Sequence, residues 1–260
     1  MSDSPNFLLF GWSIGRSLLS VRTPRPSGSG VWDHAEFAPI LGHLRDRGTS
    51  ALPELVPDIR EYLDTASTAR PDTLCRNEAL AYWINVYNAG ALLLAAEVMS
   101  TDSGSVLRIP GGFSRPFLRV DGEHLSLDAV EHAKVRRFGD PRIHAALVCG
   151  SVSCPTLRAE PYRGSNLDET LDAQLRALLA GGAVVVDRSV GRLSLSKIFQ
   201  WYGADFTRPH RMPTLLPAGG QTVLTSLGPW LDDAIADWAS ETSPTVEFLP
   251  YDWGVACTVR

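Results

Sequence analysis

The chain has 260 residues, of which 44% are hydrophobic and 20% are charged, a composition typical of a folded protein. Its 24 basic and 29 acidic residues give a formal net charge of −5, without a long run of one sign. Proteins that bind nucleic acid usually carry a clustered basic face, so this balance argues against nucleic acid as a partner.

The N-terminal sequence predicts neither export nor membrane attachment. Asp3 stands where a secretory signal has basic residues, and Gly11, Ser13 and Gly15 interrupt the apolar stretch. No later stretch reaches the roughly 18 uninterrupted apolar residues of a membrane helix. We therefore expect a soluble, cytoplasmic protein with no membrane partner.

Four cysteines, at positions 75, 149, 154 and 257, are too few and too scattered for the disulfide framework of a small secreted domain. They are expected to be reduced thiols. No CxxC pair is present, and so the usual spacing of a structural zinc site is missing. The sequence predicts neither a metal nor a cofactor.

In chain order, the first predicted feature is a flexible Pro-, Gly- and Ser-rich joint at residues 23–30. We expect residues 1–22 to pack loosely on the body. Residues 31–69 have the pattern of two helices with a break near Pro53 and Pro57, and residues 76–99 are apolar enough for a long buried helix.

The second half alternates short helices and strands. Ser126 is expected to cap a helix that ends before Pro141. The run IHAALVC suits a central strand, although a buried helical turn has the same pattern, and GSVSCP is a predicted loop. Later elements are a helix over 166–180, a strand at AVVVD, a C-terminal helix and a closing strand at TVEFLPYDW.

These elements predict an α+β fold, rich in helices, with a small antiparallel or mixed sheet. We expect one domain over residues 31–260, preceded by an extension and joint over residues 1–30.

Glu131 is the first candidate for chemistry. With Leu127, Val135 and Phe138 it has the spacing of one helical face, so its carboxylate should be largely buried and needs a partner. That partner is either a catalytic imidazole or, if Glu131 is purely structural, an arginine such as Arg142 or Arg158. His132, with Asp128 and Arg136, is predicted on the opposite, solvated face.

The segment DPRIHAALVCGSVSCP supplies a histidine and two cysteines within eleven positions. A thiol enzyme needs a nucleophile, an imidazole that takes its proton and a group that orients the imidazole. If 143–149 is a strand, His144 and Cys149 point to opposite faces, which favours Cys154. Backbone N–H groups near Cys154 would lower its pKa. A buried cysteine and a structural histidine remain the alternative.

Five segments in order resemble the DUF547 family of bacterial and plant proteins: WINVYNA, LSLDAVEH, DPRIHAALVCGSVSCPTLR, LSKIFQWYGADF and FLPYDW, across residues 31–253. The resemblance implies an α+β fold similar in places to papain-like or transglutaminase-like cysteine enzymes. It also implies a triad of Glu131, His144 and either Cys149 or Cys154. Tyr82, Gln200 and the tail after Trp253 depart from the family pattern, and Gln200 removes an acid from that position.

The leading hypothesis is acyl transfer by a peptidase, amidase or transamidase on a small-molecule or peptide substrate, with His144 close to the reactive thiol. The alternative is a non-catalytic module that binds a peptide or forms oligomers around a structural Cys/His cluster. A third hypothesis is a redox-sensing pair of Cys149 and Cys154. Asn85 and Asn88 could serve the site but more often fix loops, and Lys197, Trp201, Tyr202 and Asp205 could line a cleft.

Overall fold

The computed structural model describes residues 15–101, 103–214 and 216–260. Residues 1–14, which carry most of the predicted N-terminal extension, lie outside this part of the chain. The described chain forms two compact units. Unit 1 comprises the chain up to Phe138 with 147–167 and 252–260, and unit 2 comprises 139–146 and 168–251.

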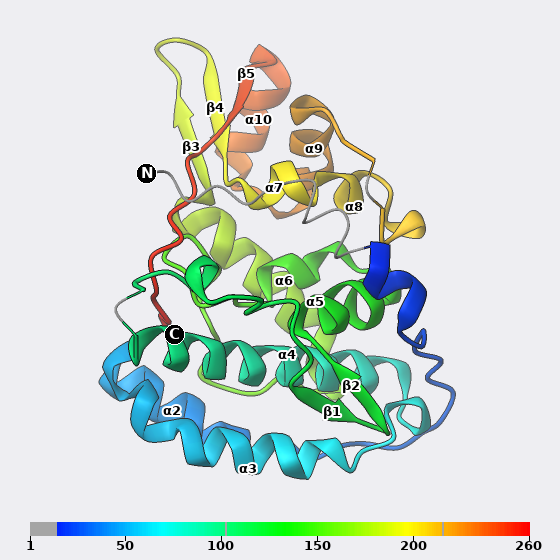
Figure 1. Ribbon diagram of the computed structural model, residues 1–260. Helices are drawn as coiled ribbons and strands as arrows, with labels where there is room; N and C mark the ends of the chain where they lie inside the picture. The colour runs from blue at the N-terminus through cyan, green and yellow to red at the C-terminus, as the bar shows by residue number, and fades with distance from the viewer. Residues whose placement is uncertain (1–14, 102, 215) are drawn as a thin grey trace. The chain divides into compact units, whose positions relative to one another are not determined.

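Unit 1 is built around α4 (Arg76–Met99), the long apolar helix that the sequence predicts (Figure 1). Its side chains are buried on nearly all sides, because neighbouring elements cover it. These elements include η1 (Thr49–Leu55), α3 (Val56–Ser67), η2 (Pro71–Thr73), η3 (Val106–Arg108) and η7 (Gly164–Asn166). Helix α2 (Phe37–Arg47) packs on η1 and α3. By length and composition α4 could cross a membrane, but 94% of its most apolar window is buried inside the protein, as in a core helix.

A two-stranded hairpin and a short mixed helix complete unit 1. Strands β1 (Leu118–Val120) and β2 (Glu123–Leu125) pair antiparallel around a turn at Asp121 and Gly122. The chain then passes through α5 (Leu127–Ala129), a π-helical turn η4 (Val130–Lys134) and the 3₁₀ turn η5 (Val135–Phe138). Ser126 caps α5 as predicted, and its hydroxyl accepts a hydrogen bond from the Ala129 N–H at 3.1 Å.

The segment before α2 is attached to unit 1 in spite of its Pro- and Gly-rich composition. Backbone N–H groups of Arg25 and Ser27 donate to Asp72, and the Gly30 N–H donates to Thr73. Upstream, the buried Lys134 ammonium donates to the carbonyl of Arg22 at 2.6 Å. Regular backbone hydrogen bonds therefore hold the predicted joint against the body, and composition alone did not indicate them.

Unit 2 packs helices against a mixed three-stranded sheet of order β3-β4-β5. Strand β4 (Arg192–Leu195) pairs antiparallel with β3 (Val184–Asp187) and parallel with β5 (Thr245–Phe248). Leu193 and Leu195 of β4 reach an apolar cluster that includes Phe199 and Leu227. The remaining elements of the unit are η6 (Pro141–Ala145), α6 (Leu167–Leu178), η8 (Leu179–Ala183), α7 (Ile198–Trp201), α8 (Gly203–Thr207), η9 (Pro209–Arg211), α9 (Gly220–Leu227), η10 (Gly228–Trp230) and α10 (Asp233–Thr242).

The α+β class, with many helices and small sheets, is confirmed. The predicted strand at 143–149 is wrong. The alternative of a buried helical turn holds for 143–145, which belong to η6, whereas 147–149 form no regular element. The Asp140 carboxylate accepts from the Arg142 N–H at 3.0 Å, and Pro141 follows at the first helical position. Together they start a 3₁₀ turn where the apolar pattern also suits a strand.

Candidate active site

The thiol loop, residues 149–154, places both motif cysteines in one tight turn of unit 1. The Cys149 N–H donates to the sulfur of Cys154 at 3.0 Å, and the Cys154 N–H donates to the Ser151 carbonyl at 3.0 Å. The sulfur of Cys149 lies 3.2 Å from the Ser151 hydroxyl. A backbone N–H that points at sulfur favours the thiolate over the thiol. Cys149 was disfavoured because a strand at 143–149 would point it away from His144. This segment is not a strand, and both thiols are partly exposed, so the objection to Cys149 no longer applies.

Gly150 gives the thiol loop its shape. Its φ of 82° lies in the left-handed region, and a Cβ at this position would lie 3.1 Å from the Ala95 Cβ of α4. Both observations explain why a residue without a side chain occupies this buried position. Gly150 thus closes the turn of the loop that the sequence predicts at GSVSCP.

The C-terminal segment, residues 252–260, runs beside the thiol loop and the residues that follow it. Val152 and Ser153 donate their N–H groups to the carbonyls of Gly254 and Asp252, at 2.8 and 3.2 Å. Ala256 donates in return to the Gly150 carbonyl at 2.9 Å. The tail that departs from the family pattern therefore supplies the backbone partners that hold the loop.

Two buried asparagines of α4 fix neighbouring loops of unit 1. The Asn88 side-chain oxygen accepts from the Val148 N–H at 2.9 Å, directly before the thiol loop. Asn85 binds both backbone groups of Tyr162, at 2.8 and 2.9 Å. In these contacts both amides fix loops, as the structural interpretation predicts, and they replace the hydrogen bonds to water that buried amide groups otherwise lose.

Glu131 lies in the π-helical turn η4 and exposes 12% of its side chain. The Tyr87 hydroxyl donates to its carboxylate at 3.2 Å, and His132 Nδ1 lies 3.6 Å from the other oxygen. Arg136 donates to the same Nδ1 at 3.3 Å. A nitrogen that accepts from a guanidinium carries no proton. The imidazole of His132 is therefore neutral, and its contact with Glu131 is not an ion pair.

The predicted solvated face of His132 and Arg136 is wrong, because both side chains are only 1% exposed. The prediction assumed 3.6 residues per turn from Leu127 onward. The i→i+5 bonding of η4 widens the turn and changes the direction in which later side chains point. A spacing of three or four residues therefore does not place side chains on the same helical face across this segment.

His144 belongs to unit 2, where Asp205 of α8 is its carboxylate partner. His144 Nε2 lies 2.9 Å from the Asp205 carboxylate, and Asp205 is fully buried. A carboxylate only accepts, so the ring donates from Nε2. Tyr202 stacks on the imidazole at a centroid distance of 4.1 Å and an angle of 18°, which fixes the plane of the ring.

The pairing with Asp205 was not predicted from the sequence, which suggested Asp205 only as part of a cleft wall. The two residues are 61 positions apart, and no local spacing connects them. The family segment LSKIFQWYGADF, which ends in an acid next to an aromatic residue, was the one available signal. The four predicted site residues divide between the units: Glu131, Cys149 and Cys154 belong to unit 1, and His144 belongs to unit 2.

Among the residues that the structure describes, no group of three or more His, Cys, Asp or Glu side chains could hold a metal ion. Of the remaining thiols, Cys257 is 1% exposed. Burial, and to a smaller extent the charge of Cys154, raises its pKa to about 12. Cys257 is therefore a neutral thiol that packs near the thiol loop.

The chain is thus a helix-rich α+β protein with a hydrogen-bonded thiol loop and a buried imidazole–carboxylate pair. Residues 71–179 match the model of the DUF547 family, which is described as a protein of unknown function. The match confirms the resemblance to this family and contains all four predicted site residues, whereas Asp205 lies beyond it. No curated protein and no solved structure matches the chain.

Proposed function

We propose that the chain is a thiol-dependent acyl-transfer enzyme, a peptidase, amidase or transamidase, in which Cys154 is the nucleophile and His144 is the base. The observation that carries the proposal is the His144–Asp205 pair. A buried carboxylate that binds one ring nitrogen fixes the tautomer and stabilises the imidazolium. A buried, stacked histidine with a carboxyl partner at hydrogen-bond distance is arranged as in a general base.

Cys154 is favoured over Cys149 because its sulfur accepts the Cys149 N–H. In the proposed reaction, His144 takes the thiol proton, and the sulfur attacks the carbonyl carbon of an amide or ester. The imidazolium returns the proton to the leaving amine or alcohol as the thioester forms. Water or an amine then attacks the thioester, which releases the acyl product and restores the thiol.

Asp205 takes the orienting role that the sequence hypothesis gave to Glu131. Glu131 stays in the proposal as a second acidic residue. It belongs to unit 1, as the thiol loop does, and its carboxylate accepts a hydrogen bond from the Tyr87 hydroxyl. Glu131→Gln tests this role, because it keeps the shape and removes the charge. If Glu131 serves the chemistry, thiol reactivity falls at an unchanged melting temperature. A lower melting temperature at unchanged reactivity assigns Glu131 a structural role.

The test of the proposal is the rate of iodoacetamide alkylation of each thiol from pH 5 to 9, measured by peptide mass spectrometry. We expect Cys154 to react fastest and to keep its reactivity below pH 7, where an ordinary thiol is protonated. His144→Gln and Asp205→Asn should remove this low-pH reactivity while Cys75, which serves as the internal reference, is unchanged.

The alternative function is a non-catalytic module in which the hydrogen bond from Cys149 to Cys154 only closes a turn. It predicts that Cys154 and Cys75 follow the same pH dependence and that His144→Gln affects neither. That result would refute the enzymatic proposal. A reversible disulfide between Cys149 and Cys154 under mild peroxide would instead support the redox pair.

A further inference from the structure

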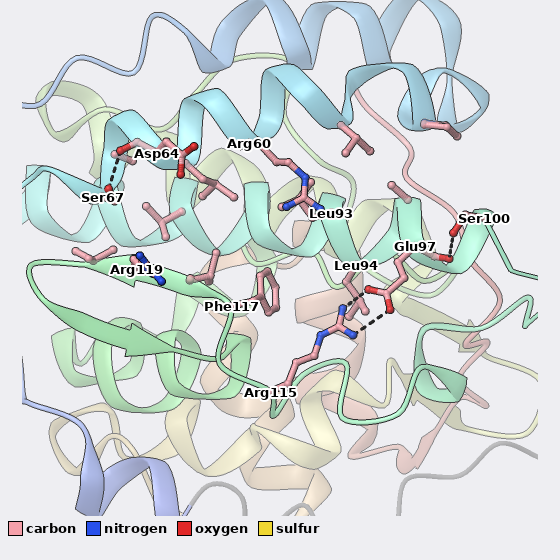
Figure 2. Close-up of a pocket in the computed structure, with 18 residues that line it drawn as sticks. Arg60, Asp64, Ser67, Leu93, Leu94, Glu97, Ser100, Arg115, Phe117 and Arg119 are labelled. Atoms are coloured by element: carbon pink, nitrogen blue, oxygen red, sulfur yellow. Dashed lines mark hydrogen bonds and ion pairs between the residues drawn. The ribbon is translucent and has the colours of Figure 1, made fainter.

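A groove of about 680 Å³ crosses the surface of unit 1 between α3, α4 and strand β1 (Figure 2). It is separate from the thiol loop and the His144–Asp205 pair, because none of those residues lines it. Leu63, Leu93 and Phe117 are half-buried in its floor and walls. The volume lies in the range of ligand-binding clefts, which is about 300–1,000 Å³.

The charged side chains of the groove are mostly basic. Figure 2 shows Arg60 projecting from α3 and Arg119 on the β1 side, with Phe117 between Arg119 and a third arginine, Arg115. Arg115 is neutralised by Glu97, to which it donates at 2.9 Å. Arg60 and Arg119 then face the single remaining carboxylate of the lining, Asp64.

Arg60 and Arg119 are exposed, and within the described part of the chain neither has an acidic side chain at ion-pair distance. The groove therefore has an excess of positive charge in a chain whose formal net charge is −5. Such a local reversal of sign attracts an anionic ligand.

Strand β1 adds a backbone edge to the groove. Asp121 and Gly122 have φ values of 48° and 79°, which define a two-residue turn flanked by the paired residues Val120 and Glu123. In an antiparallel ladder, hydrogen-bonded and non-hydrogen-bonded pairs alternate. The next pair inward, Arg119 with His124, is then non-hydrogen-bonded, so the N–H and C=O of Arg119 point away from β2. In the described chain β2 is the only strand that pairs with β1. The Asp121 N–H, which follows Arg119 on the outer side of β1, donates to the Ser67 carbonyl of α3 at 3.4 Å.

We propose that this groove binds an extended peptide in which apolar and acidic residues alternate. Its apolar side chains would contact Leu63, Leu93 and Phe117, its acidic side chains would pair with Arg60 and Arg119, and its backbone would bond the outer edge of β1. This binding requires no thiol chemistry and is independent of the function proposed above.

A peptide fits the groove better than a single-headed amphiphile, such as a fatty acid. The basic groups come from two elements, Arg60 from α3 and Arg119 from β1, and each can pair with a different carboxylate. An acyl chain with one carboxylate would use one of them and would leave the backbone edge of β1 without a partner. An alternating peptide uses all three features, because its side chains alternate between two faces.

The experiment titrates the full chain against a short fluorescein-labelled peptide of alternating leucine and glutamate and follows the fluorescence anisotropy. We expect saturable binding that weakens with added salt. Arg60→Glu and Arg119→Glu should each weaken it roughly five- to tenfold, because each reversal replaces an attraction by a repulsion. Leu63→Gln should also weaken it, whereas the control Arg70→Glu, an exposed residue outside the groove, should not.

A photoreactive group on the same peptide locates the site on the wild-type chain without any variant. Adducts within residues 53–67, 93–100 or 115–120, which line the groove, support the proposal. Adducts elsewhere, equal binding of an alternating leucine–lysine peptide, or unchanged binding to Arg60→Glu would overturn it. Binding of dodecanoate without binding of the peptide would also overturn it and would assign the groove to amphiphiles. Cys154→Ser should bind the peptide as wild type does, so this result does not depend on the enzymatic proposal.

Discussion

The thiol loop of unit 1 and the His144–Asp205 pair of unit 2 are held in place by different forces. Backbone hydrogen bonds from the C-terminal segment and one amide from α4 fix the loop, and both of its thiols remain partly exposed. The pair is buried, and its contacts include the hydrogen bond between His144 and Asp205 and the stacked ring of Tyr202. A nucleophile needs access to a substrate, whereas the orientation of a base benefits from exclusion of water. The two environments therefore suit the two proposed roles.

The largest expected effect of a single substitution is that of Asp205→Ala. It leaves the His144 ring buried with its Nε2–H unsatisfied and removes a partner that is fully shielded from water. We expect the free energy of unfolding, measured in urea, to fall by about 3–5 kcal/mol. Asp205→Asn keeps a hydrogen-bond acceptor and should lose less. A loss below about 1 kcal/mol for Asp205→Ala would mean that the pair contributes no more than an exposed ion pair.

Asn88→Ala should have a smaller effect on stability but a direct effect on the thiol loop. It leaves the buried Val148 N–H without its acceptor, at a cost of about 1–3 kcal/mol. Because Val148 precedes Cys149, the alkylation rates of Cys149 and Cys154 should change as well. Asn85→Ala is the matched control, since it frees the backbone of Tyr162 instead. Equal changes of thiol reactivity in both variants would show that Asn88 does not position the loop.

The features that could be predicted from the sequence are those that depend on local patterns, whereas contacts between residues far apart in the chain could not be predicted. Helix α4 was predictable because a largely apolar segment of 24 residues without proline is long enough to favour a buried helix over a strand. The two thiols and His144 were singled out because reactive residue types cluster in one segment, and Glu131 because of its place on an apolar helical face. Their roles in a reaction stay predictions. His132 and Arg136 were placed wrongly because a π-helical turn has no clear sequence pattern. The pairing of Asp205 with His144 and the bonding of the tail to the thiol loop join distant residues, and local spacing carries no information about either.

The smallest predicted effect concerns Cys257 and appears only at alkaline pH. Its pKa is raised from 9.0 to about 12, mainly by burial, so ionisation of this thiol is easier in the unfolded chain. The neutral thiol therefore contributes its full stability below pH 9, and this contribution is lost as the pH rises from 9 toward 12. The loss should be about 1.4 kcal/mol per pH unit in that window.

Cys257→Ala tests this prediction by the difference in slope rather than by stability itself. The variant loses some packing at every pH, but between pH 9 and 11 its stability should fall less steeply than that of wild type. Buried tyrosines such as Tyr62 and Tyr82 have raised pKa values and also titrate at high pH, but they are present in both proteins and cancel in the comparison. Cys75→Ala, which removes a partly exposed thiol, is the control for the loss of a cysteine as such. If the free energy of unfolding falls with the same slope above pH 9 in wild type and in Cys257→Ala, Cys257 is not held as a neutral thiol beside the loop. The thiol loop would then be more open to water than its backbone hydrogen bonds indicate.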